Sequence, residues 1–243
     1  MSNHLADWYE FFSNEFEWNL LLSSRVVSLI LCHDRPRDRA RQIEKFVDVA
    51  QKLRGLNNYS ALRAFVAGIN NSTFAGDQTM EKFKQRSPDS AKTLRSWDVL
   101  LQAIRAHRAY RLALRNTKGA TIPALEVHMS DLIRAHEAND DVKSGDPTKI
   151  HWGKFNMMGR FITSTTQCQA QCRSATDYNF PERQHIGNLF ITKYLMDDEM
   201  QKSRIAPPDN DYEEFSGGFP AATTATQYKP PRDMARLRRI FFR

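Results

Sequence analysis

Two cysteines on one expected helix are the first candidates for chemistry. Cys168 and Cys172 are four positions apart, so a helix would place both thiols on the same face. A zinc site needs about four ligands at set spacings. No second cysteine or histidine pair follows at a matching distance, and the nearest histidine, His185, stands alone. We therefore interpret the pair as buried or half-exposed cysteines and expect no metal.

The histidines and glycines do not predict an enzyme. His107, His128, His136 and His151 assemble no nucleophilic triad signature around a serine or cysteine. No loop of the form GxxxxGK[ST] occurs, so the chain is not expected to bind a nucleotide itself. We expect no cofactor and no covalent chemistry.

The elements that would position any site are helices, because apolar residues recur at helical spacing. One stripe consists of Ala40, Ile43, Phe46, Val47, Ala50 and Leu53. Gly55 is expected to end this helix, and Asn57-Asn58 suits the turn after it. The next stripe consists of Leu62, Phe65, Val66 and Ile69. No run of alternating apolar and polar residues predicts a sheet, so the expected fold class is all-α.

The second half of the chain continues the helical pattern. A long helical region is expected over residues 90–114, with Ser90 as its N-cap. Another helix is predicted around residues 125–133, a polar loop over 139–149, and a returning helix marked by apolar residues over 152–162. Pro181 is expected to open a final body helix.

The most apolar stretch of the chain runs from Trp18 to Cys32. Arg25 interrupts it, it is too short to cross a bilayer comfortably, and acidic residues precede it. It is interpreted as a buried helix. Three cysteines form no disulfide framework, which favours a reducing, cytoplasmic location.

The net charge of +7 is concentrated at the C-terminal end. Residues 229–243 carry six basic residues against Asp233 alone, so the body is nearly neutral and no nucleic acid is expected as a partner. Residues 206–228 are rich in Pro, Gly, Ala and Thr and predict a flexible linker. The basic tail is either an unstructured end or a helix lying on an anionic membrane to which the protein is recruited.

Three ordered blocks of sequence resemble one known family. The first joins Arg37–Val47 to Leu56–Ser60, the second is Ala67–Ser72, and the third runs from Ile122 to Asn139. Together they resemble the catalytic domain of the Ras-type guanine-nucleotide exchange factors, the son-of-sevenless group and its relatives. The resemblance covers about residues 18 to 208. It implies an all-α bundle with a protruding helical hairpin, built here from about Ile122 to Ile162.

The resemblance also implies a function and its residues. In this family a helical hairpin wedges a switch loop of a small GTPase away from its GDP. The apolar residue that closes over the metal site falls on Ile133, and the glutamate that occupies phosphate territory falls on Glu137. Their spacing of four puts both on one helix face. Arg39, Asn70, His107 and Asn139 match positions that contact the GTPase or brace the hairpin. Arg39 and Asn70 fit equally well as helix-surface and turn residues.

The sequence also departs from the family pattern. The family's opening helices are absent or unrecognisable, the segment around Ala75 differs, and His107 replaces a tyrosine. The expected domain therefore spans residues 1–205, with its N-terminal part incomplete. The expected function is nucleotide exchange on a Ras-like small GTPase, which is not covalent enzyme catalysis. A module of the same fold that binds a GTPase, or other proteins, without exchange is the alternative.

Overall fold

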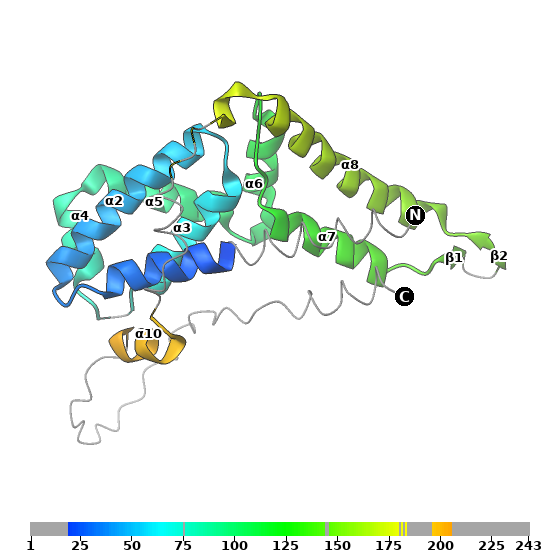
Figure 1. Ribbon diagram of the computed structural model, residues 1–243. Coiled ribbons are helices and arrows are strands. Elements are labelled where there is room, and N and C mark those ends of the chain that lie inside the picture. The colour runs from blue at the N-terminus through cyan, green and yellow to red at the C-terminus, as the bar shows by residue number, and fades with distance from the viewer. Residues whose placement is uncertain are drawn as a thin grey trace, which may run out of the picture.

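The computed structural model describes residues 19–74, 76–143, 146–179, 181, 183 and 196–205. A helix over residues 19–31 comes first. The elements that follow are α2 (Pro36–Gly55), α3 (Tyr59–Asn71), α4 (Thr79–Arg86), α5 (Pro88–Leu101), α6 (Ile104–Asn116), α7 (Leu125–Glu137), β1 (Val142–Lys143), β2 (Asp146–Ile150), α8 (Trp152–Ser174), a 3-10 turn (Thr176–Tyr178) and α10 (Asp198–Ile205). The predicted all-α class with a protruding hairpin is confirmed (Figure 1).

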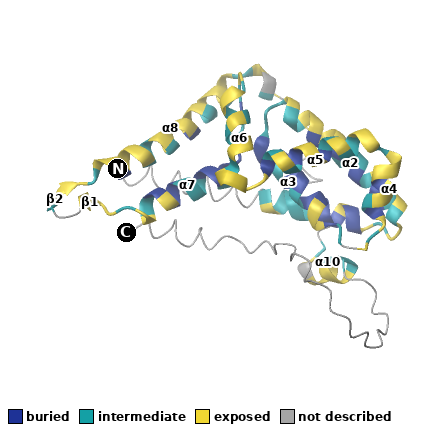
Figure 2. Ribbon diagram, turned by 180° about the vertical axis from the view of Figure 1, so that it is seen from behind, coloured by how far each residue is buried: buried dark blue, intermediate teal, exposed yellow. Residues whose placement is uncertain are grey.

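One hydrophobic core joins the body to the base of the hairpin. The α2 stripe buries Ala40, Ile43, Val47 and Ala50, and the α3 stripe buries its four predicted residues, so both interpretations are confirmed. The same core continues through Tyr110 of α6 to Ala124 and Val127 at the start of α7. Burial is densest in this body and thins toward the hairpin (Figure 2). The start of the hairpin is therefore packed into the core of the body.

The turn between α2 and α3 forms as predicted. α2 ends at Gly55, and Asn57 adopts a left-handed conformation with φ of 56°. Asparagine tolerates this region better than most residues. The Asn58 side chain then caps α3 by accepting the N–H of Ala61 at 3.0 Å. The two asparagines thus satisfy backbone geometry at the turn.

The apolar stretch near the N-terminus forms a buried helix within its described part, residues 19–31. Val26, Val27, Ile30 and Leu31 are buried. Gly68 of α3 allows a close crossing, because a Cβ there would lie 2.6 Å from the Cβ of Val26 and 2.8 Å from the Ser23 carbonyl oxygen. Among the described residues, no helix has both the length and the apolar character that a bilayer crossing requires.

The prediction of one long helical region over residues 90–114 is wrong. The helix begins at Pro88, after Ser87 rather than at Ser90, and breaks after Leu101. α6 resumes at Ile104, and three successive non-glycine residues (105–107) are left-handed with φ of 51°, 54° and 59°. Proline suits the first helical turn because it lacks an N–H that would go unused there.

The hairpin consists of α7, two short strands and α8. The polar loop predicted over residues 139–149 is wrong in part, because β1 and β2 pair antiparallel within it. In Figure 1 α6, α7 and α8 form three sides of a triangle, with α7 and α8 converging on the strands. The strands therefore mark the tip of the hairpin.

Helix α10 packs against the helix over residues 19–31. The Gln201 amide donates to Ser24 Oγ at 3.1 Å and Ser28 Oγ at 3.0 Å. The helix expected after Pro181, the linker 206–228 and the basic tail 229–243 lie wholly or largely outside the described residues. Those assignments stay predictions.

Candidate functional site

The α2–α3 turn holds both ends of the hairpin. Ahead of α7, Ile122 exchanges backbone hydrogen bonds with the turn: Tyr59 N–H donates to its carbonyl (2.9 Å), and its own N–H donates to Asn57 (3.1 Å). After α8, the Tyr178 hydroxyl donates to the Leu56 carbonyl. Because entry and exit are bonded to the same turn, the hairpin is anchored in the body at both ends.

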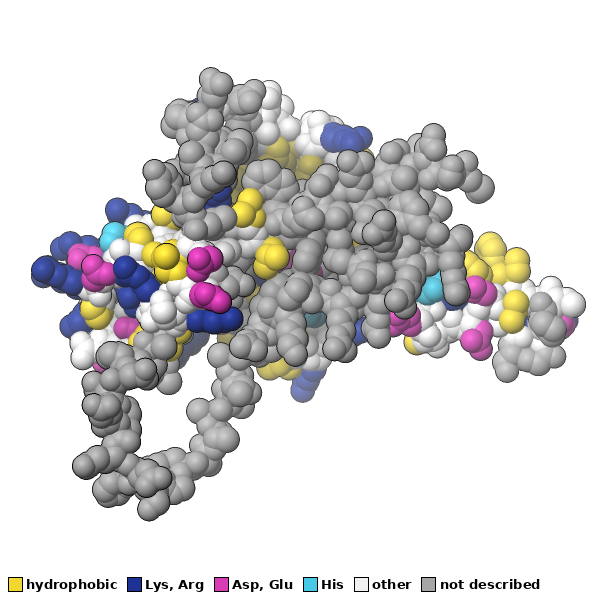
Figure 3. Space-filling model, turned by 60° about the horizontal axis from the view of Figure 1, so that its bottom comes forward, with side chains coloured by type: hydrophobic (Ala, Val, Ile, Leu, Met, Phe, Trp, Pro, Cys, Tyr) yellow, Lys and Arg dark blue, Asp and Glu magenta, His cyan; other side chains and the backbone are white. Residues whose placement is uncertain are grey.

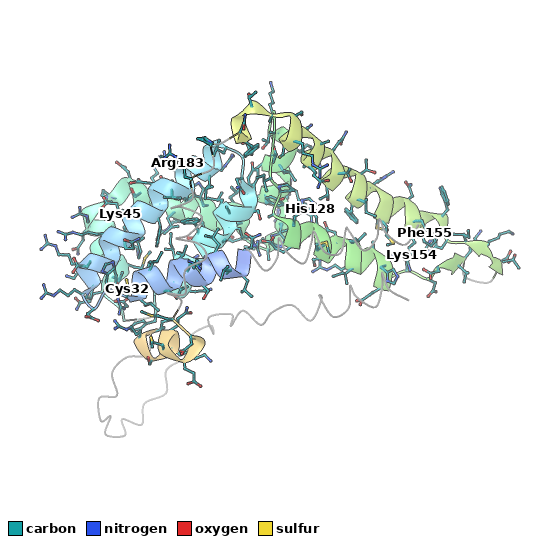
Figure 4. The ribbon with its side chains drawn as sticks, in the orientation of Figure 1. Cys32, Lys45, His128, Lys154, Phe155 and Arg183 are labelled. Carbon is teal, nitrogen blue, oxygen red and sulfur yellow. The ribbon has the colours of Figure 1, made fainter. Side chains whose placement is uncertain are left out.

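A buried polar cluster fixes α6 to the start of α7. The Tyr110 hydroxyl accepts the N–H of Ala124 at 2.9 Å and lies 2.9 Å from His128 Nε2. Burial lowers the pKa of His128 and raises that of Tyr110, so both groups are neutral at pH 7. The arrangement that satisfies both has the phenol donating to Nε2. Figure 4 shows His128 where α6 meets α7.

Two ion pairs flank this cluster on α7. Arg63 of α3 meets Glu126, with Nε 2.5 Å from Oε1. Arg111 of α6 meets Asp131, with 2.7 Å between Nη1 and Oδ2. All four side chains are partly shielded from water. α7 is therefore fastened to the body at Glu126, His128 and Asp131, and its C-terminal half projects beyond these points.

The two residues expected to act on the GTPase lie in that projecting half. Ile133 is buried, with 4% of its surface exposed. Glu137 is exposed at the last position of α7. Asn139 follows, and its amide donates to the Ala135 carbonyl at 2.9 Å, which satisfies a helix-end acceptor. The α7 helix carries both Ile133 and Glu137, but Ile133 is buried whereas Glu137 is exposed.

His107 lies in the left-handed turn of α6 and is half-buried. Its Nδ1 is shielded from water and has no hydrogen-bond partner among the described residues. Burial, and then the positive charge of Arg63, lowers the pKa of His107. Arg111 and Asp131 also act on the ring electrostatically. His107 thus neighbours the ion pairs that hold α7.

Arg39 and Asn70 are positioned by the body. Arg39, in the first turn of α2, is buried and donates from Nε to the His33 carbonyl at 2.7 Å. α2 begins at the end of the body that lies opposite the hairpin (Figure 1). Asn70 is exposed near the end of α3, and its amide donates to Asp98 at 2.8 Å. Burial raises the pKa of Asp98. The GTPase contacts assigned to Arg39 and Asn70 stay predictions.

The hairpin tip exposes apolar side chains around a buried lysine. Trp152 is 74% exposed and Ile150 64%. The Lys154 side chain is only 3% exposed, with Nζ 2.5 Å from Asp141 Oδ1. This pair joins α8 to the segment before β1. Figure 4 shows Lys154 and Phe155 near the tip, and Figure 3 shows hydrophobic and acidic side chains gathered at the hairpin end of the molecule.

Both cysteines that were considered as metal ligands lie on α8. Cys168 and Cys172 are half-buried on α8, as interpreted, and Cys172 donates to the Thr121 carbonyl. The sequence alone did not predict the hydrogen bonds that Tyr110 and Arg111 of α6 make with Ala124, His128 and Asp131. The partners in these hydrogen bonds lie 14 to 20 positions apart, so no local spacing rule reveals them. The apolar pattern that predicted α8 also gave no sign that Trp152 would be exposed.

The sequence is similar to those of several known proteins. RAS guanyl-releasing protein 1 of Xenopus laevis is 29% identical over 210 residues, which cover 86% of this chain and 25% of that protein. RAS guanyl-releasing protein 4 of Mus musculus is 32% identical over 189 residues, covering 76% and 27%. Ras guanine nucleotide exchange factor K of Dictyostelium discoideum is 30% identical over 149 residues, covering 61% and 9%.

The chain therefore spans about a quarter or less of the length of these relatives. The family model of the RasGEF domain matches residues 10–156, which is more than half of the chain. That range contains the body, α7, both strands and the start of α8. The chain belongs to the RasGEF domain family.

Proposed function

We propose that this chain promotes release of GDP from a Ras-like small GTPase by inserting the α7–α8 hairpin. The observation that carries the proposal is a projecting hairpin whose two ends are bonded to one turn of the body. Hydrogen bonds at both ends restrict movement of the hairpin relative to the body, which a wedge requires. Membership of the RasGEF domain family and the names of the related exchange factors support the same function.

The physical requirement for exchange is preferential binding to the nucleotide-free GTPase. If the chain binds that state more tightly than the GDP-loaded state, linkage weakens GDP binding by the same factor. No covalent bond is made or broken in this process. A carboxylate placed near the phosphate-binding amides and lysine competes with the anion for its place. Glu137, exposed at the end of α7, is suited to this role.

The role of Ile133 depends on whether its side chain, which is buried here, becomes accessible to the GTPase. Burial of an isoleucine side chain is worth about 1.5–3 kcal/mol. Ile133 is buried here, so its insertion over the metal site requires that apolar surface of the GTPase replace its present surroundings. Exposed apolar residues at the tip, Ile150 and Trp152, supply surface for such a contact. His107, Asn70, Arg39 and Asn139 are proposed as further contacts or braces.

The burial of Ile133 also favours the second candidate function. If Ile133 stays covered in the complex, the hairpin binds the GTPase without closing its metal site. The chain would then be a binding module of the same fold. It would form a complex with the GTPase and leave GDP release at its intrinsic rate.

Release of fluorescent GDP from a panel of Ras-, Rap- and Ral-type GTPases tests the proposal. We expect the wild-type chain to accelerate release from at least one member of the panel, and its presence to weaken the equilibrium affinity of that GTPase for GDP. A stable complex with nucleotide-free GTPase and no acceleration would favour the binding module. A folded chain that does neither would refute both functions.

A further inference from the structure

A single guanidinium joins two elements that the proposed function uses separately. Arg111 of α6 donates from Nε to the Ala106 carbonyl at 2.6 Å. Its Nη2 donates to Asp131 Oδ1 at 2.9 Å, and its Nη1 lies 2.7 Å from Oδ2. Ala106 belongs to the left-handed turn, and Asp131 belongs to the outgoing helix of the hairpin. The planar fork of arginine suits simultaneous contact with a carbonyl and both carboxylate oxygens.

The left-handed turn needs such an external support. Residues 105–107 are all non-glycine with positive φ, a conformation in which the Cβ crowds the following carbonyl. Such backbone persists only where surrounding contacts hold it. Within the described residues, the Arg111 contact with Ala106 is one such contact, and it comes from a side chain that also grips α7.

The ion pair between Arg111 and Asp131 is partly shielded from water. The Asp131 side chain is 13% exposed and that of Arg111 is 31% exposed. A partly buried ion pair is screened less by water and salt than a fully exposed one. His107 directly follows Ala106, so a shift of the turn moves His107, and a shift of α7 moves Ile133, two positions beyond Asp131.

We infer that Arg111 is a positioning residue for nucleotide exchange: it locks the turn that carries His107 to the hairpin helix, so both meet the GTPase as one rigid surface. This inference rests on the proposed function. Arg111 itself acts through Asp131 and Ala106.

The test compares Arg111→Lys with Arg115→Lys, an exposed arginine further along the same helix. A lysine keeps the charge but cannot bridge both partners. We expect Arg111→Lys to retain its helical circular dichroism while the maximal rate of GDP release falls roughly tenfold, the loss of about one charge-assisted hydrogen bond. The concentration of chain giving half-maximal release should change less. Asp131→Asn, which keeps the side-chain shape, should give the same pattern.

Hydrogen exchange of the free chain provides a readout that needs no GTPase. Arg111→Lys should speed amide exchange in residues 104–107 and 125–137 and leave α2 and α3 unchanged, whereas Arg115→Lys should alter neither. Faster exchange everywhere would mean a general stability role and would overturn the inference. Equal release rates for the two lysine variants would also overturn it. If the wild-type chain accelerates no GTPase, the proposed function fails, and local loosening would still show that Arg111 joins the two elements.

Discussion

Removal of one hydroxyl group, in Tyr110→Phe, should loosen the hairpin from the body. The phenol oxygen accepts the N–H of Ala124, and the hydroxyl bonds His128 Nε2. Tyr110 and Ala124 are almost completely inaccessible to water. Phenylalanine keeps the ring and its edge-to-face contact with Tyr59, so the change isolates the two hydrogen bonds. Both partners that lose a bond belong to the start of the hairpin.

The expected cost follows from the burial of these partners. A buried polar group left without its partner costs about 1–3 kcal/mol. Two such groups predict a loss of about 2–6 kcal/mol in the free energy of unfolding. For a chain of this size each kcal/mol lowers Tm by about 2–4 °C, so the melting temperature should fall by roughly 4–24 °C.

Urea denaturation followed by circular dichroism measures the loss, and Tyr59→Phe is the matched control. The Tyr59 hydroxyl is also buried, but it bonds Thr117 Oγ1, which keeps a second bond to the Ala113 carbonyl. The control should therefore lose about 1 kcal/mol. A Tyr110→Phe variant within about 0.5 kcal/mol of the wild-type chain would refute the claim that this cluster fastens the hairpin.

Three further predictions test other parts of the molecule. Gly68→Ala should cost about 1–3 kcal/mol in urea denaturation, because the new methyl group would overlap Val26; an unchanged midpoint would mean that the two helices do not cross closely. Burial lowers the pKa of His128, so the unfolded state binds the proton more readily, and stability should be constant above about pH 6.5 and decline below it. His128→Gln should flatten part of this decline, leaving the share of His107, whose pKa is also lowered; identical slopes in the two proteins would contradict the assignment. Trp152→Ala should leave stability within about 0.5 kcal/mol, because the side chain is 74% exposed, yet raise the concentration needed for half-maximal GDP release by roughly 30-fold; an unchanged concentration would exclude the tip as a contact.

The parts of the fold that the sequence predicts are those with local signals. Apolar residues at helical spacing identified α2 and α3, and Gly55 with Asn57 marked the turn between them. Each signal is confined to neighbours in the chain and needs no tertiary contact. The hairpin came from the resemblance of residues 122–139 to a known family.

The break between α5 and α6 had no such signal. Residues 102–107 contain neither glycine nor proline, and apolar side chains at Trp97, Leu101 and Ile104 continue the helical spacing across it. The left-handed turn is held instead by a contact from Arg111. Likewise, Tyr110 reads as one more residue of an apolar stripe until the fold places it beside His128.

For the proposed contact residues, too, the sequence predicted their place in a helix but not their exposure. The spacing of Ile133 and Glu137 predicted their common helix, but their exposure depends on what packs against α7. Apolar residues over 152–162 also predicted the returning helix α8, but not that Trp152, at the hairpin tip, is 74% exposed. Side chains at a projecting tip break the rule that an apolar stripe is buried.

Glu137→Gln provides the most direct test of the exchange mechanism, with Glu81→Gln on α4 as control. Both glutamates are exposed, and the substitution keeps the size of the side chain while removing its charge. Release of fluorescent GDP is measured with the GTPase that responds best to the wild-type chain. If the Glu137 carboxylate competes for the phosphate site, the maximal rate should fall about 10- to 100-fold in Glu137→Gln, while Glu81→Gln should match the wild-type chain. Equal maximal rates for the two variants would contradict the insertion mechanism.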